Sequence, residues 1–206
     1  MDDLKIVVAA FDFDGTITYG DSLIPFILFA KGPWQTVKGL SLLQRPLVDY
    51  FSKKISPQQV KEILITHFFY GDPMADLAKK GKAFAEKIVP KLYRKTAFKA
   101  LKWHMAQGHR CIIVTAAFDF YLEAWAKKVG FEHIICSALE LTPEGCLSGA
   151  LAGGSCTGAE KCRRLQAFLG QRDQYILHVY ADSNENTELL AMADYPHKRP
   201  SPGRSD

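Results

Sequence analysis

The sequence has no apolar run long enough to cross a membrane, since about 18 or more uninterrupted apolar residues would be needed and none occurs. The segment Met1–Lys5 lacks the basic-then-apolar layout of a signal peptide. The five cysteines form no C-x-x-C pair and are odd in number, which argues against a disulfide framework and against a zinc site. The net charge is only +4, without a long basic run, and so predicts nucleic-acid binding poorly. We therefore expect a cytoplasmic protein with reduced cysteines that does not bind nucleic acid.

Internal repeats and low-complexity segments are also missing, which excludes repeat proteins and disordered chains. Hydrophobic residues make up 48% of the sequence, enough for one sizeable core and a smaller appendage. None of the histidines has the spacing of metal ligands, so structural or exposed positions are expected for them.

An apolar run near the N-terminus, Ile6–Phe11, leads into two aspartates, Asp12 and Asp14. If the run is a buried strand, residues two apart point to the same side, so both carboxylates leave its end together. Gly15 then allows a sharp turn. Two like charges this close repel unless a cation lies between them or one is protonated. The pair therefore indicates metal-assisted acid–base chemistry, and the alternative is a strand followed by an ordinary Asp-Gly turn.

The wider pattern resembles the haloacid dehalogenase-like phosphohydrolases, whose motifs follow one another in a fixed order. Asp12 opens the first motif, D-x-D-G-T, and Thr115 ends the second apolar strand, Arg110–Thr115. Lys161 matches the third motif. Asp182 ends a later apolar strand and matches the first acid of the fourth motif. Four motifs in order across nearly the whole chain are far more specific than any one of them alone.

The first two motif strands lie much further apart in the chain than an ordinary crossover helix requires. The intervening segment carries helix-start signals, such as Ser56–Gln59, where a capping serine, a first-turn proline and a capping-box glutamine coincide. This pattern predicts an inserted helical cap domain over residues 18–92, with residues 1–17 and 93–206 as the catalytic core. We expect the cap to hinge where it leaves and rejoins the core, and to close over the site.

In the core segment, strand and helix signals alternate, which predicts an α/β fold with a doubly wound parallel sheet, that is, a Rossmann-like core. Strands are expected near residues 110–115, 133–137 and 175–181, and helices near residues 119–129, 157–169 and 185–193. A hairpin is expected at Leu139–Leu151, because Thr142–Gly145 has turn chemistry. The tail from His197 onward is expected to be frayed. Ligands of such sheets bind beyond the carboxyl ends of the strands, which is where the motif residues fall.

The resemblance implies a phosphomonoester hydrolase that forms an aspartyl-phosphate intermediate and uses Mg²⁺. Asp12 would be the nucleophile, and Asp14 would protonate the leaving alcohol and then activate the hydrolytic water. The metal would be held by a carboxylate oxygen of Asp12, the backbone carbonyl of Asp14, and Asp182.

Further residues would serve the phosphate and the metal indirectly. By the same resemblance, Thr115, Ala116 and Lys161 would hold the phosphate oxygens. Asn186 and Ser183 would lie just behind the metal. Taken singly, these residues have ordinary alternatives: Thr115 as a strand end, Lys161 as a solvated first-turn lysine, and the Asp182-Ser183 pair as a helix cap.

Two positions of the fourth motif depart from the family pattern. Ala181 stands where the family usually has glycine, and Asn186 stands where it usually has a second acid. Asparagine keeps the shape and hydrogen bonding of an acid but loses the charge, so weaker magnesium affinity is expected. A catalytically degenerate phosphate-binding protein is therefore an alternative, although the nucleophile, acid, lysine and first metal ligand all remain.

The position of the cap in the chain resembles the phosphoserine-phosphatase-like subgroup, and Asp14 disfavours dehalogenation, which has no leaving alcohol to protonate. The substrate is expected to be a small-molecule phosphomonoester, phosphoserine-like or a related metabolite. Asp21 falls where phosphoserine phosphatases carry an acid for the substrate ammonium, and it is equally suited to cap a helix. Apolar stretches with basic edges, Leu23–Ala30 and Val37–Val48, make a lipid phosphate of the phosphatidylglycerophosphate type, with peripheral membrane contact, the alternative. The oligomeric state stays open.

Overall fold

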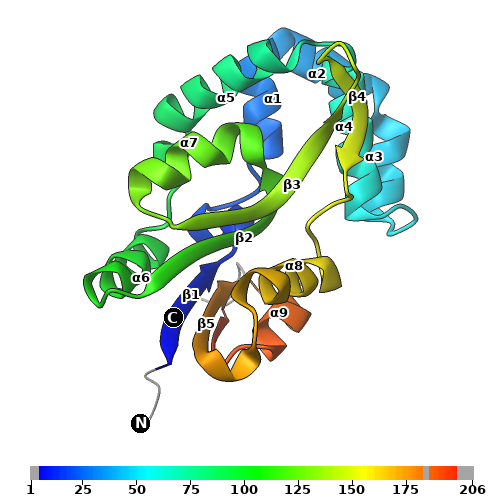
Figure 1. Ribbon diagram of the computed structural model, residues 1–206. Helices are drawn as coiled ribbons and strands as arrows, with labels where there is room; N and C mark the ends of the chain where they lie inside the picture. Colours follow the sequence, from blue (N-terminus) through cyan, green and yellow to red (C-terminus); the bar gives the residue numbers. More distant parts are fainter. Residues whose placement is uncertain (1–4, 183–185, 199–206) are drawn as a thin grey trace.

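A β-sheet forms the centre of the part of the chain that the structure describes. The structure, a computed structural model, describes residues 5–182 and 186–198. In these residues a six-stranded sheet has the strand order β4-β3-β2-β1-β5-β6 (Figure 1). Its strands are β1 Ile6–Phe11, β2 Arg110–Phe118, β3 His133–Leu141, β4 Leu147–Ala152, β5 Tyr175–Ala181 and β6 Tyr195–Lys198. Neighbouring strands are parallel except β3 and β4, which are antiparallel.

Helices cover both faces of the sheet, because alternate residues of its central strands point to opposite sides. The covering helices are α6 Lys95–Ala106, α7 Asp119–Val129, α8 Ala159–Leu169 and α9 Thr187–Ala191. Phe11 is buried in one apolar cluster with Tyr121 of α7, whereas Val8 is buried in another with Leu165 of α8. Figure 1 shows α6 and α7 on one side of the sheet and α8 and α9 on the other. The predicted doubly wound α/β fold is confirmed.

The prediction of a frayed tail is wrong for the first two residues of that tail, because they belong to the sixth strand. Tyr195–Lys198 pairs in parallel with β5, so His197 and Lys198 belong to the sheet. All four residues of the strand are exposed and one is a proline, which is typical of an edge strand and carries no apolar periodicity. The His197 ring stacks on Tyr180 of β5 at 4.1 Å between centroids. This pairing is a tertiary effect that the local sequence does not reveal.

Between β1 and β2 the chain forms a helical insertion, as predicted. Its helices are α1 Leu23–Lys31, α2 Pro33–Leu42, α3 Gln44–Phe51, α4 Pro57–Phe69 and α5 Met74–Lys87. The capping box of α4 is formed as expected: Ser56 Oγ accepts from the Gln59 backbone at 3.2 Å, and Gln59 Oε1 accepts from the Ser56 backbone at 2.7 Å. Within the described part of the chain, none of the helices combines the length and apolar character that a membrane span requires.

The two ends of the insertion lie side by side. Arg94 donates its backbone N–H to Ile17 at 2.8 Å, and Tyr19 donates to Leu92 at 2.9 Å. These bonds support domain boundaries after residue 17 and before residue 93, which stay a prediction.

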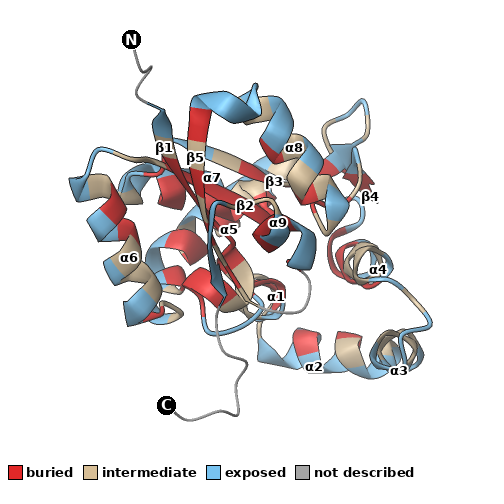
Figure 2. Ribbon diagram, turned by 90° about the horizontal axis from the view of Figure 1, so that it is seen from below, coloured by how far each residue is buried: buried red, intermediate tan, exposed pale blue. Residues whose placement is uncertain are grey.

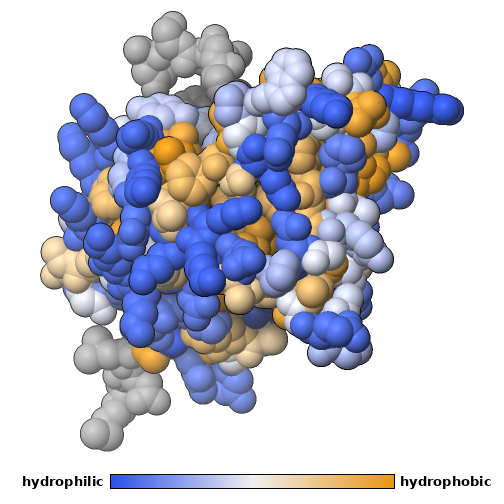
Figure 3. Space-filling model, turned by 90° about the horizontal axis from the view of Figure 1, so that it is seen from above, coloured by the Kyte–Doolittle hydropathy of each residue, from blue (hydrophilic) through white to orange (hydrophobic). Residues whose placement is uncertain are grey.

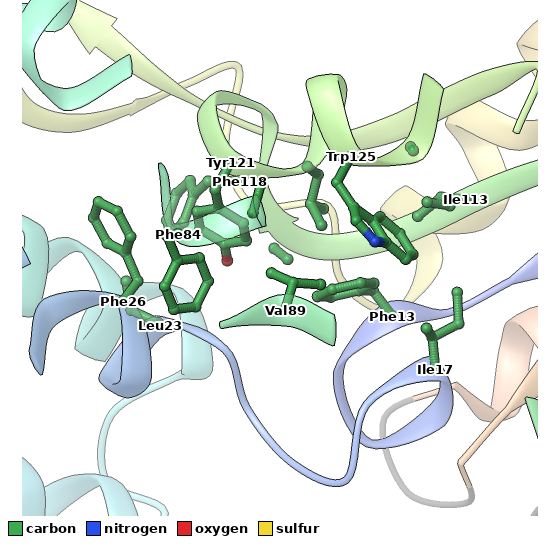
Figure 4. Packing of buried hydrophobic residues seen from close by; sticks show 14 of the residues in the cluster. Phe13, Ile17, Leu23, Phe26, Phe84, Val89, Ile113, Phe118, Tyr121 and Trp125 are labelled. Carbon is green, nitrogen blue, oxygen red and sulfur yellow. The ribbon is translucent and has the colours of Figure 1, made fainter. Parts of the chain in front are cut away.

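The insertion and the core share one buried apolar cluster. Phe26 of α1 and Phe84 of α5 both pack on Tyr121 of α7, each at 5.6 Å between ring centroids. The Tyr121 hydroxyl also forms a 2.8 Å hydrogen bond with Ser22. Figure 4 shows these rings side by side, with Phe118 beside them, and all of these side chains are fully buried. The cap therefore has no separate apolar core of its own at this point.

The predicted hairpin is formed by β3 and β4, and it makes a second set of contacts between the core and the cap. Its tip binds the α4–α5 connection: Gly71 donates to Leu147 at 2.9 Å, and Leu147 donates to Asp72 at 3.0 Å. Gly149 of β4 lies so close to α4 that a β-carbon there would meet Thr66 Oγ1 at 2.5 Å. A rigid-body opening of the whole cap would break both the hairpin contacts and the shared apolar cluster.

Candidate active site

The loop after β1 is wound tightly against the end of β5. Asp12 donates its backbone N–H to Tyr180 at 2.9 Å, and Thr16 Oγ1 accepts the backbone N–H of Asp182 at 2.9 Å. Gly15 has φ +76°, and a β-carbon at this position would lie 2.5 Å from Asp182 Oδ2. Both the positive φ and this close approach require glycine here. The loop thus brings Asp12 and Asp182, far apart in sequence, to one point.

Four polar side chains form a closed network at that point. Lys161 donates through Nζ to Asp12 Oδ1 at 2.9 Å and to Asn186 Oδ1 at 2.6 Å. Asn186 donates through Nδ2 to Asp12 Oδ2 at 3.0 Å and to Asp182 Oδ1 at 2.9 Å. The side chains of Lys161 and Asp12 are only 4% and 5% exposed. A buried charge pair of this kind is rarely retained for stability alone.

The charges of the network perturb one another. Burial alone would lower the pKa of Lys161, but the Asp12 carboxylate outweighs burial and raises that pKa. Burial, and then Asp12, raise the pKa of Asp182. Burial and then Asp21 raise the pKa of Asp14 to about 8, against the opposing effect of Lys61. Four carboxyl groups, those of Asp12, Asp14, Asp21 and Asp182, line the pocket together with two lysines, Lys61 and Lys161, and a bound cation would favour the ionised form of the carboxyl groups.

The C-terminal part of β2 supplies the opposite wall, and the strand runs on to Phe118 instead of ending at Thr115 as predicted. Thr115 is fully buried, and its Oγ1 accepts the backbone N–H of Ala117 at 3.1 Å. Ala116 next to it presents its backbone carbonyl to Lys61 Nζ of α4 at 2.9 Å. Lys61 was not predicted from the sequence. Lys61 lies one turn before the buried residues Leu64 and Ile65, so it shares their face of α4. A lysine on the apolar face of a helix is unusual, and this position is the sequence signal that could have identified it.

A pocket of about 310 Å³ joins the network to the cap. Most of the predicted site residues line it: Asp12, Asp14, Asp21, Thr115, Ala116, Lys161, Asp182 and Asn186. Asp21 also accepts the backbone N–H of Leu23 at 2.8 Å, so it caps α1 while it faces the pocket. Ser183 lies outside the described residues.

The donor set at the floor of the pocket fits a small divalent cation. Among the described residues no group of three or more His, Cys, Asp or Glu side chains is arranged to hold a metal ion. Mg²⁺ needs no such group, because it commonly takes one or two carboxylates and completes its shell with water and substrate phosphate. Asp12 and Asp182, joined by Asn186, meet that requirement with oxygen ligands alone.

A family model and a sequence relative both match most of the chain. A family model described as haloacid dehalogenase-like hydrolase matches residues 9–185. Protein CicA of Caulobacter vibrioides is 32% identical over 189 residues, which cover 91% of this chain and 83% of that protein.

Solved structures share the fold. A protein of unknown function from Bordetella pertussis Tohama I matches 97% of this chain and 92% of its own, with a TM-score of 0.78 and 21% identity. A substrate-bound phosphoserine phosphatase matches 94% of this chain and 85% of its own, with a TM-score of 0.60 and 14% identity. A phosphoserine phosphohydrolase-like protein from Francisella tularensis matches 94% and 86%, with a TM-score of 0.64 and 14% identity. At these identities the likeness concerns the fold.

Proposed function

The chain belongs to the haloacid dehalogenase-like hydrolases, and from that membership we propose that it is a magnesium-dependent phosphomonoesterase acting through an aspartyl-phosphate. The observation that carries the proposal is the buried network of Asp12, Lys161, Asn186 and Asp182 at the floor of the pocket. It holds a carboxylate nucleophile in place beside a fixed positive charge, which is what attack on a phosphate dianion requires.

In the first half-reaction a carboxylate oxygen of Asp12 forms a bond to phosphorus while the bond from phosphorus to the ester oxygen breaks. The electron pair of the broken bond stays on the ester oxygen, which takes a proton from Asp14. In the second half-reaction Asp14 accepts a proton from water as the water oxygen attacks phosphorus, and Asp12 leaves as a free carboxylate. Burial, which favours the protonated form of Asp14, supports its role as the first proton donor.

Lys161 and the end of β2 would hold the phosphate. The Lys161 ammonium is fixed by Asp12 and Asn186 and offers its charge to the phosphoryl oxygens. Thr115 and the backbone of Ala116 border the same space. When bound, Mg²⁺ would neutralise phosphate charge, held by Asp12, Asp182 and the Asp14 carbonyl.

Two substrate classes are compatible with this chemistry. A small polar phosphomonoester such as a phosphoserine-like metabolite would use Asp21 and Lys61, the charged groups that reach the pocket from the cap side. A lipid phosphate would use the apolar side chains that line the rest of that side. The alternative hypothesis is a phosphate-binding protein that has lost catalysis, and only Asn186 and Ala181 suggest it.

The test is hydrolysis of p-nitrophenyl phosphate with Mg²⁺. The Asp12→Asn variant should lose several orders of magnitude in kcat, because it removes the nucleophile while changing little volume. Asp76→Asn, an exposed carboxylate on α5, is the matched control and should keep full activity. Chelation by EDTA should abolish turnover by the wild type. Phosphate binding without turnover would instead support the degenerate protein, and activity that survives in Asp12→Asn would defeat the mechanism.

A further inference from the structure

The cap side of the active-site pocket is mostly apolar. Three helices build it, and its apolar lining consists of Leu23 and Ile24 of α1, Leu47, Tyr50 and Phe51 of α3, and Pro57, Val60 and Leu64 of α4. The charged side chains on this side are Asp21 and Lys61, and each already has a protein partner. Asp21 caps α1, and Lys61 donates to the Ala116 carbonyl. The wall therefore offers a leaving group mainly hydrocarbon surface.

This wall does not serve simply as the core of the cap. None of the residues of α3 is buried, although three of them line the pocket, and Figure 2 shows the whole helix in the colours of exposed and intermediate residues. Phe51 lines the pocket and yet is 79% exposed, so the apolar wall runs out of the pocket onto the surface. A single exposed apolar residue is common on protein surfaces, but this ring continues the apolar lining of a pocket.

The cap segment that carries Phe51 also exposes other apolar residues together with basic ones. Trp34 and Leu42 are exposed by 78% and 68%. Exposed basic residues of the same segment are Lys38, Arg45, Lys53 and Lys54. Figure 3 shows hydrophobic side chains among hydrophilic ones at the right-hand end of the molecule, where Figure 1 places α3. An apolar group leaving the pocket past Phe51 would emerge beside α3, in a segment whose surface is partly apolar and partly basic.

We propose that the substrate is a phosphate monoester whose alcohol carries an apolar chain. Its phosphate would lie against Asp12 and Lys161, and its chain would run between α1, α3 and α4 and leave past Phe51. The proposal rests on the proposed function. A polar amino-acid ester fits the wall less well, because its charged groups would lose water beside hydrocarbon, whereas each buried methylene strengthens binding about threefold to fourfold.

The direct experiment measures kcat/KM for a series of unbranched monoalkyl phosphates, from ethyl to octyl, with phosphoserine as the polar reference. The value should rise by about tenfold or more between ethyl and hexyl phosphate, mainly through KM, as methylenes enter the wall. No rise with chain length, or a preference for phosphoserine over hexyl phosphate, would overturn the proposal. Hydrolysis of p-nitrophenyl phosphate is measured in the same assay. If this ester is hydrolysed, only the substrate proposal has failed; if it is not hydrolysed, the proposed phosphatase function has failed as well.

A pair of variants on α3 ties the chain-length effect to the wall. Phe51→Ser removes an exposed ring and is expected to fold, and it should lower kcat/KM for octyl phosphate far more than for ethyl phosphate. Val48→Ser removes a similarly exposed apolar residue of the same helix that does not line the pocket, and the chain-length profile should stay as in the wild type. Calorimetric binding of hexylphosphonate, which cannot be hydrolysed, should weaken in Phe51→Ser only. Equal effects of the two variants would contradict the proposal.

The chain-bearing phosphate has two possible sources, a dissolved amphiphile or a lipid in a bilayer. Octyl phosphate below its micelle concentration represents the first, and phosphatidylcholine vesicles containing phosphatidic acid represent the second. Faster turnover of the vesicle phosphate would identify a bilayer substrate, and faster turnover of dissolved octyl phosphate would identify a soluble one. Turnover of neither, with phosphoserine hydrolysed, would overturn the proposal.

Discussion

Asn186, which stands in place of the second acid of the fourth motif, donates its side-chain N–H to Asp12 at 3.0 Å. The same nitrogen also donates to Asp182, so one uncharged amide holds two carboxylates together. A carboxylate here would repel both, unless a cation lay between them. The asparagine therefore joins the two carboxylates without adding charge, whereas an acid in its place would add a negative charge that Lys161 and a metal ion would have to balance.

The first prediction follows from that relationship. Asn186→Asp should lower the magnesium concentration needed for half-maximal activity, because it adds negative charge beside the cation. Without metal the variant should lose roughly 1–3 kcal/mol of stability, since two donated hydrogen bonds become carboxylate repulsions. Magnesium titration of activity and thermal unfolding with and without EDTA measure the two effects. An unchanged or raised magnesium requirement would show that another group already supplies the charge.

A second prediction concerns Gly15. Gly15→Ala would force a β-carbon to within 2.5 Å of Asp182 Oδ2 at a positive φ, so we expect a loss of about 1–3 kcal/mol and a higher magnesium requirement as Asp182 moves. Gly20→Ala is the matched control, because no atom lies within 4 Å of its added β-carbon. Urea unfolding and magnesium titration would detect the difference. Equal stability and equal magnesium dependence for both variants would contradict this assignment.

Much of the site could be predicted because parallel strands end at a common edge. Asp12, Thr115 and Asp182 each follow an apolar run, and the runs are adjacent strands of one sheet, so the residues converge. Lys161 could be predicted only from motif order, since by itself it resembles an exposed lysine of a first helical turn, whereas in the structure it is buried.

The features that could not be predicted depend on packing between segments that are far apart in the sequence. Lys61 faces the site because α4 lies over the end of β2, and nothing near Lys61 in sequence records that position. Phe26 and Phe84 of the cap and Tyr121 of the core form one cluster, which no local pattern in the sequence records. Strand β6 is short, exposed and paired only at one edge, so it has no periodicity to detect.

A third prediction concerns Lys61. Its ammonium lies 2.9 Å from the Ala116 carbonyl, beside the space proposed for phosphate. Lys61→Met keeps the length of the chain but removes the charge, and should raise KM about tenfold to hundredfold with a smaller change in kcat. Lys79→Met, an exposed lysine on α5, is the control and should change neither constant. An effect on kcat alone would assign Lys61 to the chemical step instead.

The fourth prediction concerns the effect of pH on a cluster of four histidines, His104, His109, His178 and His197. His104 is fully buried, bonded to Tyr180 at 3.0 Å and to His109 at 2.7 Å. Burial, followed by the charges of His178 and His109, lowers its pKa to about 4. Between about pH 6.5 and 4, His104 is protonated in the unfolded chain but not in the folded chain. The contribution of neutral His104 to the free energy of unfolding is therefore fully present above this window and is lost as pH falls through it.

The loss attributable to His104 is at most roughly 3 kcal/mol across the full window. Urea unfolding at a series of pH values between 7 and 5, above the range where most carboxylates titrate, would measure its onset. His104→Gln should lose less stability than the wild type as pH falls from 7 to 5. In both proteins His178 and His197, whose pKa values burial lowers, add to that loss, and Asp14, whose pKa burial raises to about 8, opposes it. The same slope in both proteins would rule out His104 as the source.

The last prediction concerns removal of the cap. A cap that merely hinges over the site could be deleted between residues 21 and 89 and leave a core able to hydrolyse p-nitrophenyl phosphate. The packing changes that expectation, because deletion would strip Phe26 and Phe84 from Tyr121 and expose the apolar face of α7 (Figure 4). We expect the capless chain to be insoluble or to lack cooperative unfolding. Phe84→Ala alone should cost about 3–5 kcal/mol, whereas Tyr70→Ala, an exposed ring after α4, should cost little. A soluble, cooperatively folding capless core would show that the shared cluster is dispensable and that the cap is a separate lid.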